Sequence, residues 1–270
     1  MSTVHLTRKR SVIILFFILV NSFVHAQEPL NSGSINVNGK SIYYETYGSG
    51  EPLVFLHGYG LSSQSWKSYV ASFEKDYRVY LIDLPGHGKS SRFMEDLSFR
   101  DMAADVNQVL VQLGLSNVKA IGFSFGADIL FQLALINPKM VDSMVSVGST
   151  GSWDINDFPE LKKTFTYANR DKFPWLVDSQ SNEEQVKLVL EQFQNYTVYL
   201  TDEQLQHIRA RVLIVSGDND PGVDLQEVAR LKAYLPQCDI WILPHVGHSA
   251  HTGENKSDFV EKSLAFLAGK

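Results

Sequence analysis

The sequence has little of several features that would point at once to a function class. Its 270 residues contain one cysteine, Cys238, so the chain cannot form an internal disulfide, and we expect this residue to be structural. The formal net charge is −6, without the basic excess that is typical of nucleic-acid-binding proteins. We therefore expect no nucleic-acid partner. With 44% hydrophobic and 20% charged residues, the composition is that of an ordinary globular protein.

Long apolar runs are also scarce, apart from one near the N-terminus. Residues 12–20 (VIILFFILV) are all apolar, residues 8–10 (Arg-Lys-Arg) supply a basic flank, and residues 24–26 (Val-His-Ala) resemble a signal-peptidase site. The run is shorter than the roughly 20 residues that span a bilayer. We predict a signal peptide over residues 1–26 and an exported protein, periplasmic or secreted, with no stable membrane span after cleavage. An uncleaved anchor is the alternative.

The remaining sequence alternates short apolar segments with longer segments of helical period. Strands are predicted over residues 34–37, 41–47, 52–56, 78–83, 118–122, 141–147, 212–216 and 240–243. Helices are predicted over residues 99–113, 127–136, 225–235 and 256–267. Asn38-Gly39 between the first two strands is a strong hairpin signal. The alternation predicts an α/β fold, with a mainly parallel sheet flanked by helices.

Residues 151–209 interrupt this alternation. They show no strand pattern, and they predict a small helical cap between a core of residues 27–150 and 210–270. The cap is rich in aromatic residues, and we expect two or three of them to line a substrate pocket while the others form the core of the cap. They are Trp153, Phe158, Phe165, Tyr167, Phe173, Trp175, Phe193, Tyr196 and Tyr199. A cap at this point would cover the sheet edge at which open α/β sheets bind ligands.

A serine between two glycines follows the predicted strand over residues 118–122. The sequence Gly-Phe-Ser124-Phe-Gly has the G-x-S-x-G spacing of a strand-to-helix turn that exposes a nucleophile. Flanking glycines fit this turn because they have no Cβ to clash with the neighbouring strand and helix. The pattern alone arises by chance in roughly one chain of this length in ten. A serine also needs a base, a group that orients the base, and donors for the oxyanion.

Candidates for these roles follow other predicted strands. The loop His57-Gly-Tyr-Gly and the first turn after Ser124 predict the N–H groups of Tyr59 and Phe125 as oxyanion donors, and His57 is expected to brace the loop. The loop at residues 217–221 contains two carboxylates. We favour Asp220 as the orienting acid over Asp218, because Asp220 lies farther past the strand and can turn back toward the site.

The base is predicted in the histidine-rich loop after residue 243. His248 follows Gly247, whose small size lets the loop approach the serine, whereas His245 and His251 are expected to be peripheral. Three histidines could also suggest a metal, but no matching carboxylate or cysteine set accompanies them, so we predict neither a metal nor another cofactor. The order Ser124, Asp220, His248 is the order of α/β-hydrolases.

The motifs together resemble those of α/β-hydrolase fold proteins of the single-cap serine hydrolase type. The matching stretches span nearly the whole mature chain; they are residues 57–60, 83–90, 122–126, 217–220 and 247–248. In relatives residues 83–90 form a structural turn. Epoxide hydrolases and haloalkane dehalogenases place an aspartate where this chain has Ser124, so the resemblance argues against those activities. Asp128, on the helix after the serine, departs from the small or apolar residue often seen there.

The resemblance implies a serine hydrolase that cleaves carboxylic esters of small molecules through an acyl-enzyme. Carbon–carbon bond hydrolysis, lactone opening and amide cleavage could use the same three residues. A ligand receptor with an inactive triad is a non-enzymatic alternative. For Asp128 two environments stay open at this point, a solvated helix position or a contact with the loop that carries the base.

Overall fold

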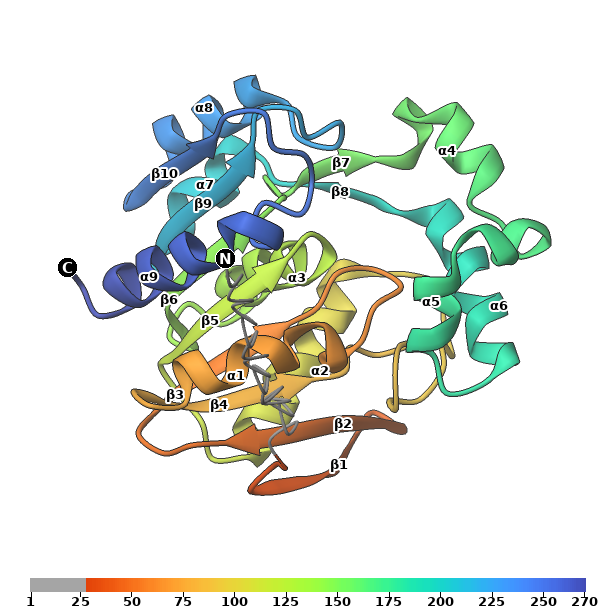
Figure 1. Ribbon diagram of the computed structural model, residues 1–270, viewed down its shortest axis with the longest axis horizontal. Coiled ribbons are helices and arrows are strands. Elements are labelled where there is room, and N and C mark those ends of the chain that lie inside the picture. Colours follow the sequence, from red (N-terminus) through yellow and green to blue (C-terminus); the bar gives the residue numbers. More distant parts are fainter. Residues whose placement is uncertain (1–27) are drawn as a thin grey trace, which may run out of the picture.

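The computed structural model describes residues 28–270, and the predicted signal peptide lies outside these residues. An eight-stranded sheet forms the centre of the molecule, in the order β1-β2-β4-β3-β5-β6-β9-β10 (Figure 1). The strands are β1 Asn31–Val37, β2 Lys40–Tyr47, β3 Glu51–Leu56, β4 Tyr77–Ile82, β5 Val118–Phe123, β6 Val141–Val147, β9 Arg211–Gly217 and β10 Cys238–Leu243. The six strands from β4 to β10 in this order pair in parallel, whereas β1 and β2 are antiparallel. The predicted α/β fold with a mainly parallel sheet is confirmed.

The local sequence explains the hairpin at one edge of the sheet and the buried strands at its centre. Asn38 and Gly39 connect β1 to β2 with φ values of 49° and 77°, a backbone region that these two residue types adopt at low cost. The central strands are apolar on both sides because helices cover both faces of a parallel sheet. In β3, for example, residues 53–56 are all buried.

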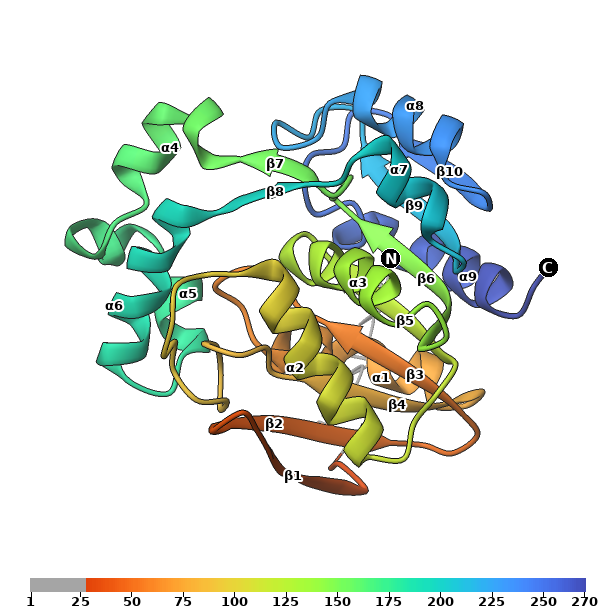
Figure 2. The ribbon, with the colours of Figure 1, turned by 180° about the vertical axis from the view of Figure 1, so that it is seen from behind.

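Helices cover the two faces of the sheet in unequal numbers. On one face lie α1 Lys67–Phe73 and α9 Lys256–Leu267, and on the other lie α2 Phe99–Gln112, α3 Phe125–Ile136 and α8 Leu225–Tyr234 (Figures 1 and 2). The first pair buries Phe73 and Phe259 against the sheet, and the second group buries residues such as Val106 and Leu130. The sheet therefore lies between two hydrophobic cores.

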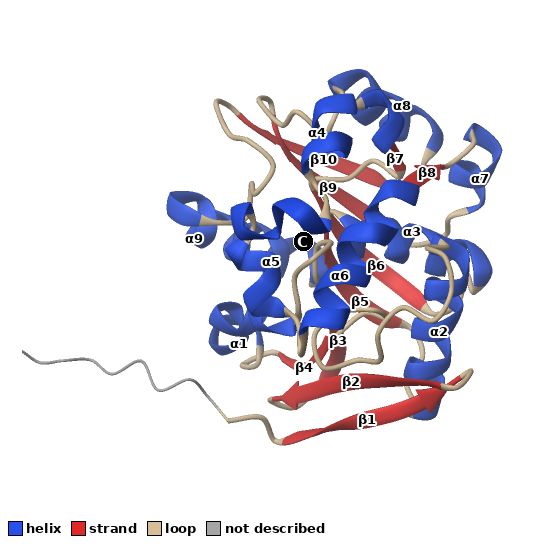
Figure 3. Ribbon diagram, turned by 90° about the vertical axis from the view of Figure 1, so that its right-hand side faces the viewer, coloured by secondary structure: helices blue, strands red, loops and turns tan. Residues whose placement is uncertain are grey.

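The segment between β6 and β9 projects beyond the sheet. It contains β7 Ser152–Asp154, α4 Pro159–Thr164, α5 Pro174–Ser179, α6 Glu183–Gln192, β8 Thr197–Tyr199 and α7 Asp202–His207. The short 3-10 helices of residues 28–270 are η1 Ser63–Trp66, η2 Ile155–Asp157, η3 Tyr167–Lys172, η4 Phe193–Asn195 and η5 Gly253–Asn255. Figure 3 views the molecule from this side, with α5 and α6 in front of the sheet. We call residues 151–209 the cap.

The expectation that the cap contains no strand is wrong. β7 and β8 pair antiparallel and run side by side from the core to the cap helices (Figure 1). Each strand has three residues, which is too short to establish the alternation of apolar and polar residues that reveals a strand in a sequence.

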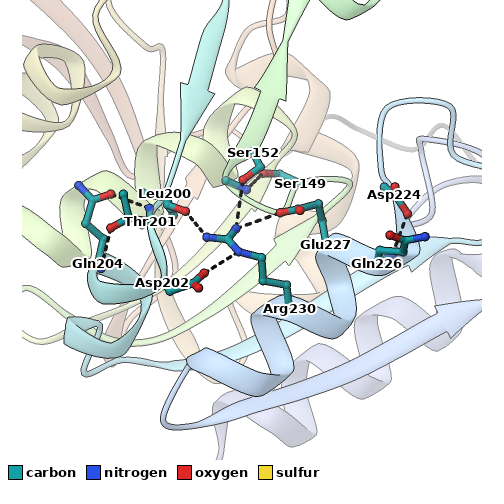
Figure 4. A network of polar contacts seen from close by, with 11 residues as sticks. Ser149, Ser152, Leu200, Thr201, Asp202, Gln204, Asp224, Gln226, Glu227 and Arg230 are labelled. Carbon is teal, nitrogen blue, oxygen red and sulfur yellow. Dashed lines mark hydrogen bonds and ion pairs between the residues drawn. The ribbon is translucent and has the colours of Figure 1, made fainter.

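Arg230 of α8 fixes β7 and β8 to the core at the point where the chain enters β7 and leaves β8 (Figure 4). Its guanidinium donates to Ser152 Oγ at 3.4 Å at the start of β7 and to the carbonyl of Leu200 after β8. It also pairs with Asp202 Oδ1 at 2.7 Å and Glu227 Oε2 at 2.9 Å. A planar guanidinium suits this task because its donors point in several fixed directions at once.

Candidate active site

Ser124 stands on a strained turn between β5 and α3. Its φ of 50° and ψ of −116° are unusual for a residue with a side chain, and its N–H donates to Val147 O at 2.7 Å. A Cβ on Gly122 would lie 2.6 Å from the backbone of Ala127, and one on Gly126 would lie 2.4 Å from the carbonyl oxygen of Leu56. Close backbone packing therefore requires glycine at both positions. This is the same reason that the G-x-S-x-G pattern gave for them.

The loops after β9 and β10 bring Asp220 and His248 together. Asp220 Oδ2 lies 2.8 Å from His248 Nδ1, and the other Asp220 oxygen accepts the N–H of Gly222 at 2.8 Å. Because a carboxylate only accepts hydrogen bonds, Nδ1 carries the proton and Nε2 keeps a free lone pair. The Asp220 side chain is fully buried, while that of His248 is 40% exposed, so the imidazole reaches from a fixed anchor into an open space.

Ser124 and His248 line the same cavity but do not form a direct hydrogen bond among the described residues. The ring of His248 packs against Phe123, next to the serine, with 5.0 Å between ring centroids. Such bonds are often long in the absence of substrate and tighten when it binds. The three predicted residues thus share one site at the carboxyl ends of β5, β9 and β10.

Of the two residues predicted as oxyanion donors, Phe125 directly follows Ser124 and Tyr59 lines the same cavity. Phe125 begins α3, and the first N–H groups of a helix have no partner within it. The N–H of Tyr59 donates no hydrogen bond to any described residue. The Tyr59 side chain is fixed by its hydroxyl, which donates to Val189 O of α6 at 2.6 Å.

The loop that carries Tyr59 is braced from the core and from the cap. His57 is buried; its Nε2 accepts the N–H of Leu84 at 2.9 Å, so its Nδ1 donates to Gly58 O at 2.8 Å. Burial lowers the pKa of His57 and favours this neutral form. Gln180 Nε2 donates to Gly60 O at 2.9 Å from the cap. Nothing in the sequence pattern indicated Gln180, because it is 120 residues away from the loop.

The cavity above Ser124 has a volume of about 670 Å³, within the range of small-molecule sites. The expectation that two or three cap aromatics line it is wrong, since six of the nine do so. They are Trp153, Phe158, Phe165, Trp175, Phe193 and Tyr196. The cap is a thin layer, and the same aromatic rings that pack against one another, such as Phe165 and Phe193 at 4.4 Å, also face the cavity.

Asp128 is not the solvated helix residue that the sequence left open as one environment, and it faces His248, of the loop that carries the base, through electrostatics and not through a hydrogen bond. It is 3% exposed and lines the cavity, one helical turn after Ser124. The hydroxyl of Tyr196 donates to its Oδ2 at 2.6 Å, and the hydroxyl of Ser149 donates to its Oδ1. Burial raises the pKa of Asp128 to about 6, against the opposing effect of these two hydrogen bonds.

The other polar residues of the predicted loops have structural environments. Asp218 Oδ1 accepts the N–H of His245 at 2.6 Å and so fixes the turn, and His245 is exposed. His251 is buried among aromatic rings, including Phe123 at 4.6 Å, and burial lowers its pKa to about 3. Asp83 accepts the N–H groups of Ser63 and Lys89, as a residue of a structural turn would.

Residues 28–270 contain no group of three or more histidine, cysteine or acidic side chains placed to hold a metal ion. Within the same range no helix has both the length and the apolar character needed to cross a bilayer.

Comparison with curated proteins finds esterases among the relatives. The chain is 36% identical over 124 residues to the pimeloyl-[acyl-carrier protein] methyl ester esterase of Pectobacterium carotovorum, covering 45% of this chain and 47% of that protein. The chain thus spans about half the length or less of the first curated relatives it matches. A longer match, 26% over 215 residues, covers 77% of this chain and 79% of the enzyme of the same name from Yersinia enterocolitica.

Solved structures share the fold across most of the chain. The α/β hydrolase MGS-M2 from a Medee basin deep-sea metagenome library has a TM-score of 0.75 at 20% identity, over 88% of this chain and 98% of that one. The carboxylesterase CesB from Bacillus subtilis has a TM-score of 0.74 at 18% identity, over 89% and 92%. The family model described as alpha/beta hydrolase fold matches residues 51–200, more than half of the chain. The chain therefore belongs to the α/β-hydrolase fold family.

Proposed function

We propose that the protein is a carboxylic ester hydrolase that acts on small molecules through Ser124, His248 and Asp220. The observation that carries the proposal is the hydrogen-bonded Asp220–His248 pair in the same cavity as a serine on a strained turn. The names of the esterase relatives support the choice of ester over other bonds.

In the proposed reaction Ser124 Oγ attacks the ester carbonyl while its proton passes to Nε2 of His248. The negative charge on the carbonyl oxygen is stabilised by the N–H groups of Tyr59 and Phe125. His248 then gives the proton to the leaving alkoxide as the carbon–oxygen bond breaks, which leaves an acyl-serine. Water attacks this intermediate by the same route in reverse and releases the acid. Asp220 keeps Nδ1 protonated and stabilises the imidazolium.

Ser124→Ala tests the proposal with p-nitrophenyl butyrate as substrate. We expect kcat to fall by about 10⁴-fold or more while the protein stays folded. Ser257→Ala is the matched control, because Ser257 lies exposed on α9, outside the residues that line the cavity. Equal activity of the Ser124→Ala variant and the wild type would refute the proposal. Amide and lactone substrates with the same acyl chain would show whether another bond is preferred.

We also propose that the protein is exported after removal of residues 1–26, on the strength of the basic, apolar and small-residue segments of that sequence. Mass spectrometry of the protein recovered from the exported fraction is expected to find a chain that begins at Gln27. A chain that retains residue 1 in the membrane fraction would indicate an anchor instead.

A further inference from the structure

Two carboxylates line the cavity, and the proposed mechanism uses Asp220 but not Asp128. The N–H of Asp128 donates to Ser124 O at 3.1 Å, so the two residues occupy one turn at the start of α3. Both side chains line the same cavity. A group that contacts Asp128 would therefore lie only a few bonds away from a carbonyl group held at Ser124.

The polar contacts of Asp128 leave its charge incompletely compensated. Two neutral hydroxyls, from Ser149 and Tyr196, each donate one hydrogen bond to it, the backbone N–H of Gly151 is a third neutral donor, and the charge of His248 also acts on it. No lysine, arginine or histidine forms an ion pair with it within residues 28–270. An ionised carboxylate can accept about four hydrogen bonds, so Asp128 keeps the capacity for a further donor. Burying a charge in this way is costly unless a partner compensates it.

The other carboxylate of the cavity, Asp220, is already bonded to His248 and Gly222, and the remaining oxygen-bearing side chains of the wall are neutral hydroxyls. Most of the wall consists of aromatic and aliphatic side chains, among them Phe123, Trp153 and Phe158. A substrate that fills this space needs a large apolar part. Any hydrogen-bond donor that it carries near the ester would find its strongest partner in Asp128, since a bond to a charged group is stronger than one to a neutral group.

We propose that Asp128 determines specificity in this cavity, by accepting a hydrogen bond from a hydroxyl or ammonium group on the substrate close to the ester and by disfavouring esters with a second carboxylate. This inference rests on the proposed esterase function. It differs from a structural role, in which Asp128 only ties α3 to the cap through Tyr196. A structural role would make the Asp128→Asn variant lose activity equally on all esters.

The experiment compares four methyl esters of similar size: methyl hexanoate, methyl 3-hydroxyhexanoate, methyl 3-aminohexanoate and monomethyl glutarate. For the wild type we expect kcat/KM to be about 10-fold higher for the two donor-bearing esters than for the hexanoate, and lower for the glutarate monoester. In Asp128→Asn these differences should shrink, most for the amine and the carboxylate. Asp154→Asn is the matched control, because Asp154 lies in β7 but does not line the cavity, and it should keep the wild-type ratios.

A second measurement separates this inference from the proposed function. Ser124→Ala, which should bind without turnover, is titrated with methyl hexanoate and methyl 3-hydroxyhexanoate, alone and combined with Asp128→Asn. Tighter binding of the hydroxy ester that depends on Asp128, with no hydrolysis by the wild type, would overturn the esterase proposal and support the specificity role. Hydrolysis of all four esters without preference, or ratios unchanged in Asp128→Asn, would overturn the specificity role alone.

Discussion

Replacing Asp128 by asparagine should change how the stability of the protein depends on pH. Burial raises the pKa of Asp128 from 3.8 to about 6 in the folded protein. As the pH rises above the pKa that Asp128 has in the unfolded chain, its carboxyl ionises in the unfolded chain but stays largely protonated in the folded protein. The free energy of unfolding therefore falls through this window, and Asp128→Asn removes the effect because asparagine does not ionise.

The difference between the folded and unfolded pKa of Asp128 corresponds to about 3 kcal/mol in the free energy of unfolding, of which about 2 kcal/mol is lost above about pH 4.5. The neighbouring groups of Asp128 are Tyr196 and Ser149, which donate to it, and His248, whose charge lowers its pKa. Burial raises the pKa of Tyr196 well above its usual value, so Tyr196 does not titrate in this range. We subtract the free energy of unfolding of the wild type from that of Asp128→Asn. This difference is expected to rise between about pH 4.5 and 7 and then to level off.

Urea unfolding at several pH values measures this difference, in which the contributions of other carboxylates cancel. Asp154→Asn provides a control of opposite sign, because a hydrogen bond from the backbone of Asn156 lowers the pKa of Asp154. Asp154 therefore stabilises the wild type above its unfolded pKa, and that contribution is lost as pH falls. A difference for Asp128→Asn that stays flat, or that falls as pH rises, would refute the reasoning.

Three further changes test other parts of the structure. Asp220→Asn should lower kcat on p-nitrophenyl butyrate by about 10⁴-fold with little change in melting temperature, because it favours the wrong tautomer of the base; a loss below tenfold would contradict the assigned role. Gly126→Ala should destabilise the protein by about 1–3 kcal/mol in urea unfolding, since the new Cβ meets the backbone of β3, whereas Gly33→Ala, with its nearest neighbour at 3.7 Å, should be nearly neutral. Arg230→Ala should lower stability by about 1–3 kcal/mol and speed proteolysis within the cap, because buried acceptors lose a charged donor; unchanged cleavage would show that the cap is held by other contacts.

Much of the fold could be predicted because its signals are local. The hairpin at Asn38-Gly39, the buried strands and the helix starting after Ser124 each depend on a few adjacent residues. The glycines around Ser124 also have a local reason, since the turn brings backbone atoms too close for a Cβ. The cap is less predictable because its strands have three residues each and its aromatic residues look the same whether they face the cavity or one another.

The sequence by itself determined the fold class and the identity of Ser124, Asp220 and His248 as the residues to examine. It could do so because strands in parallel βα units carry their following loops to one edge of the sheet, so residues distant in the chain can be assigned to one place. Only the tertiary structure decided the environment of Asp128. Its partners Tyr196 and Ser149 are 68 and 21 residues away, and the cap that buries it comes from a separate segment. The burial of Asp128 and the rise in its pKa arise only when these distant segments pack together. They therefore cannot be predicted from a short stretch of the sequence.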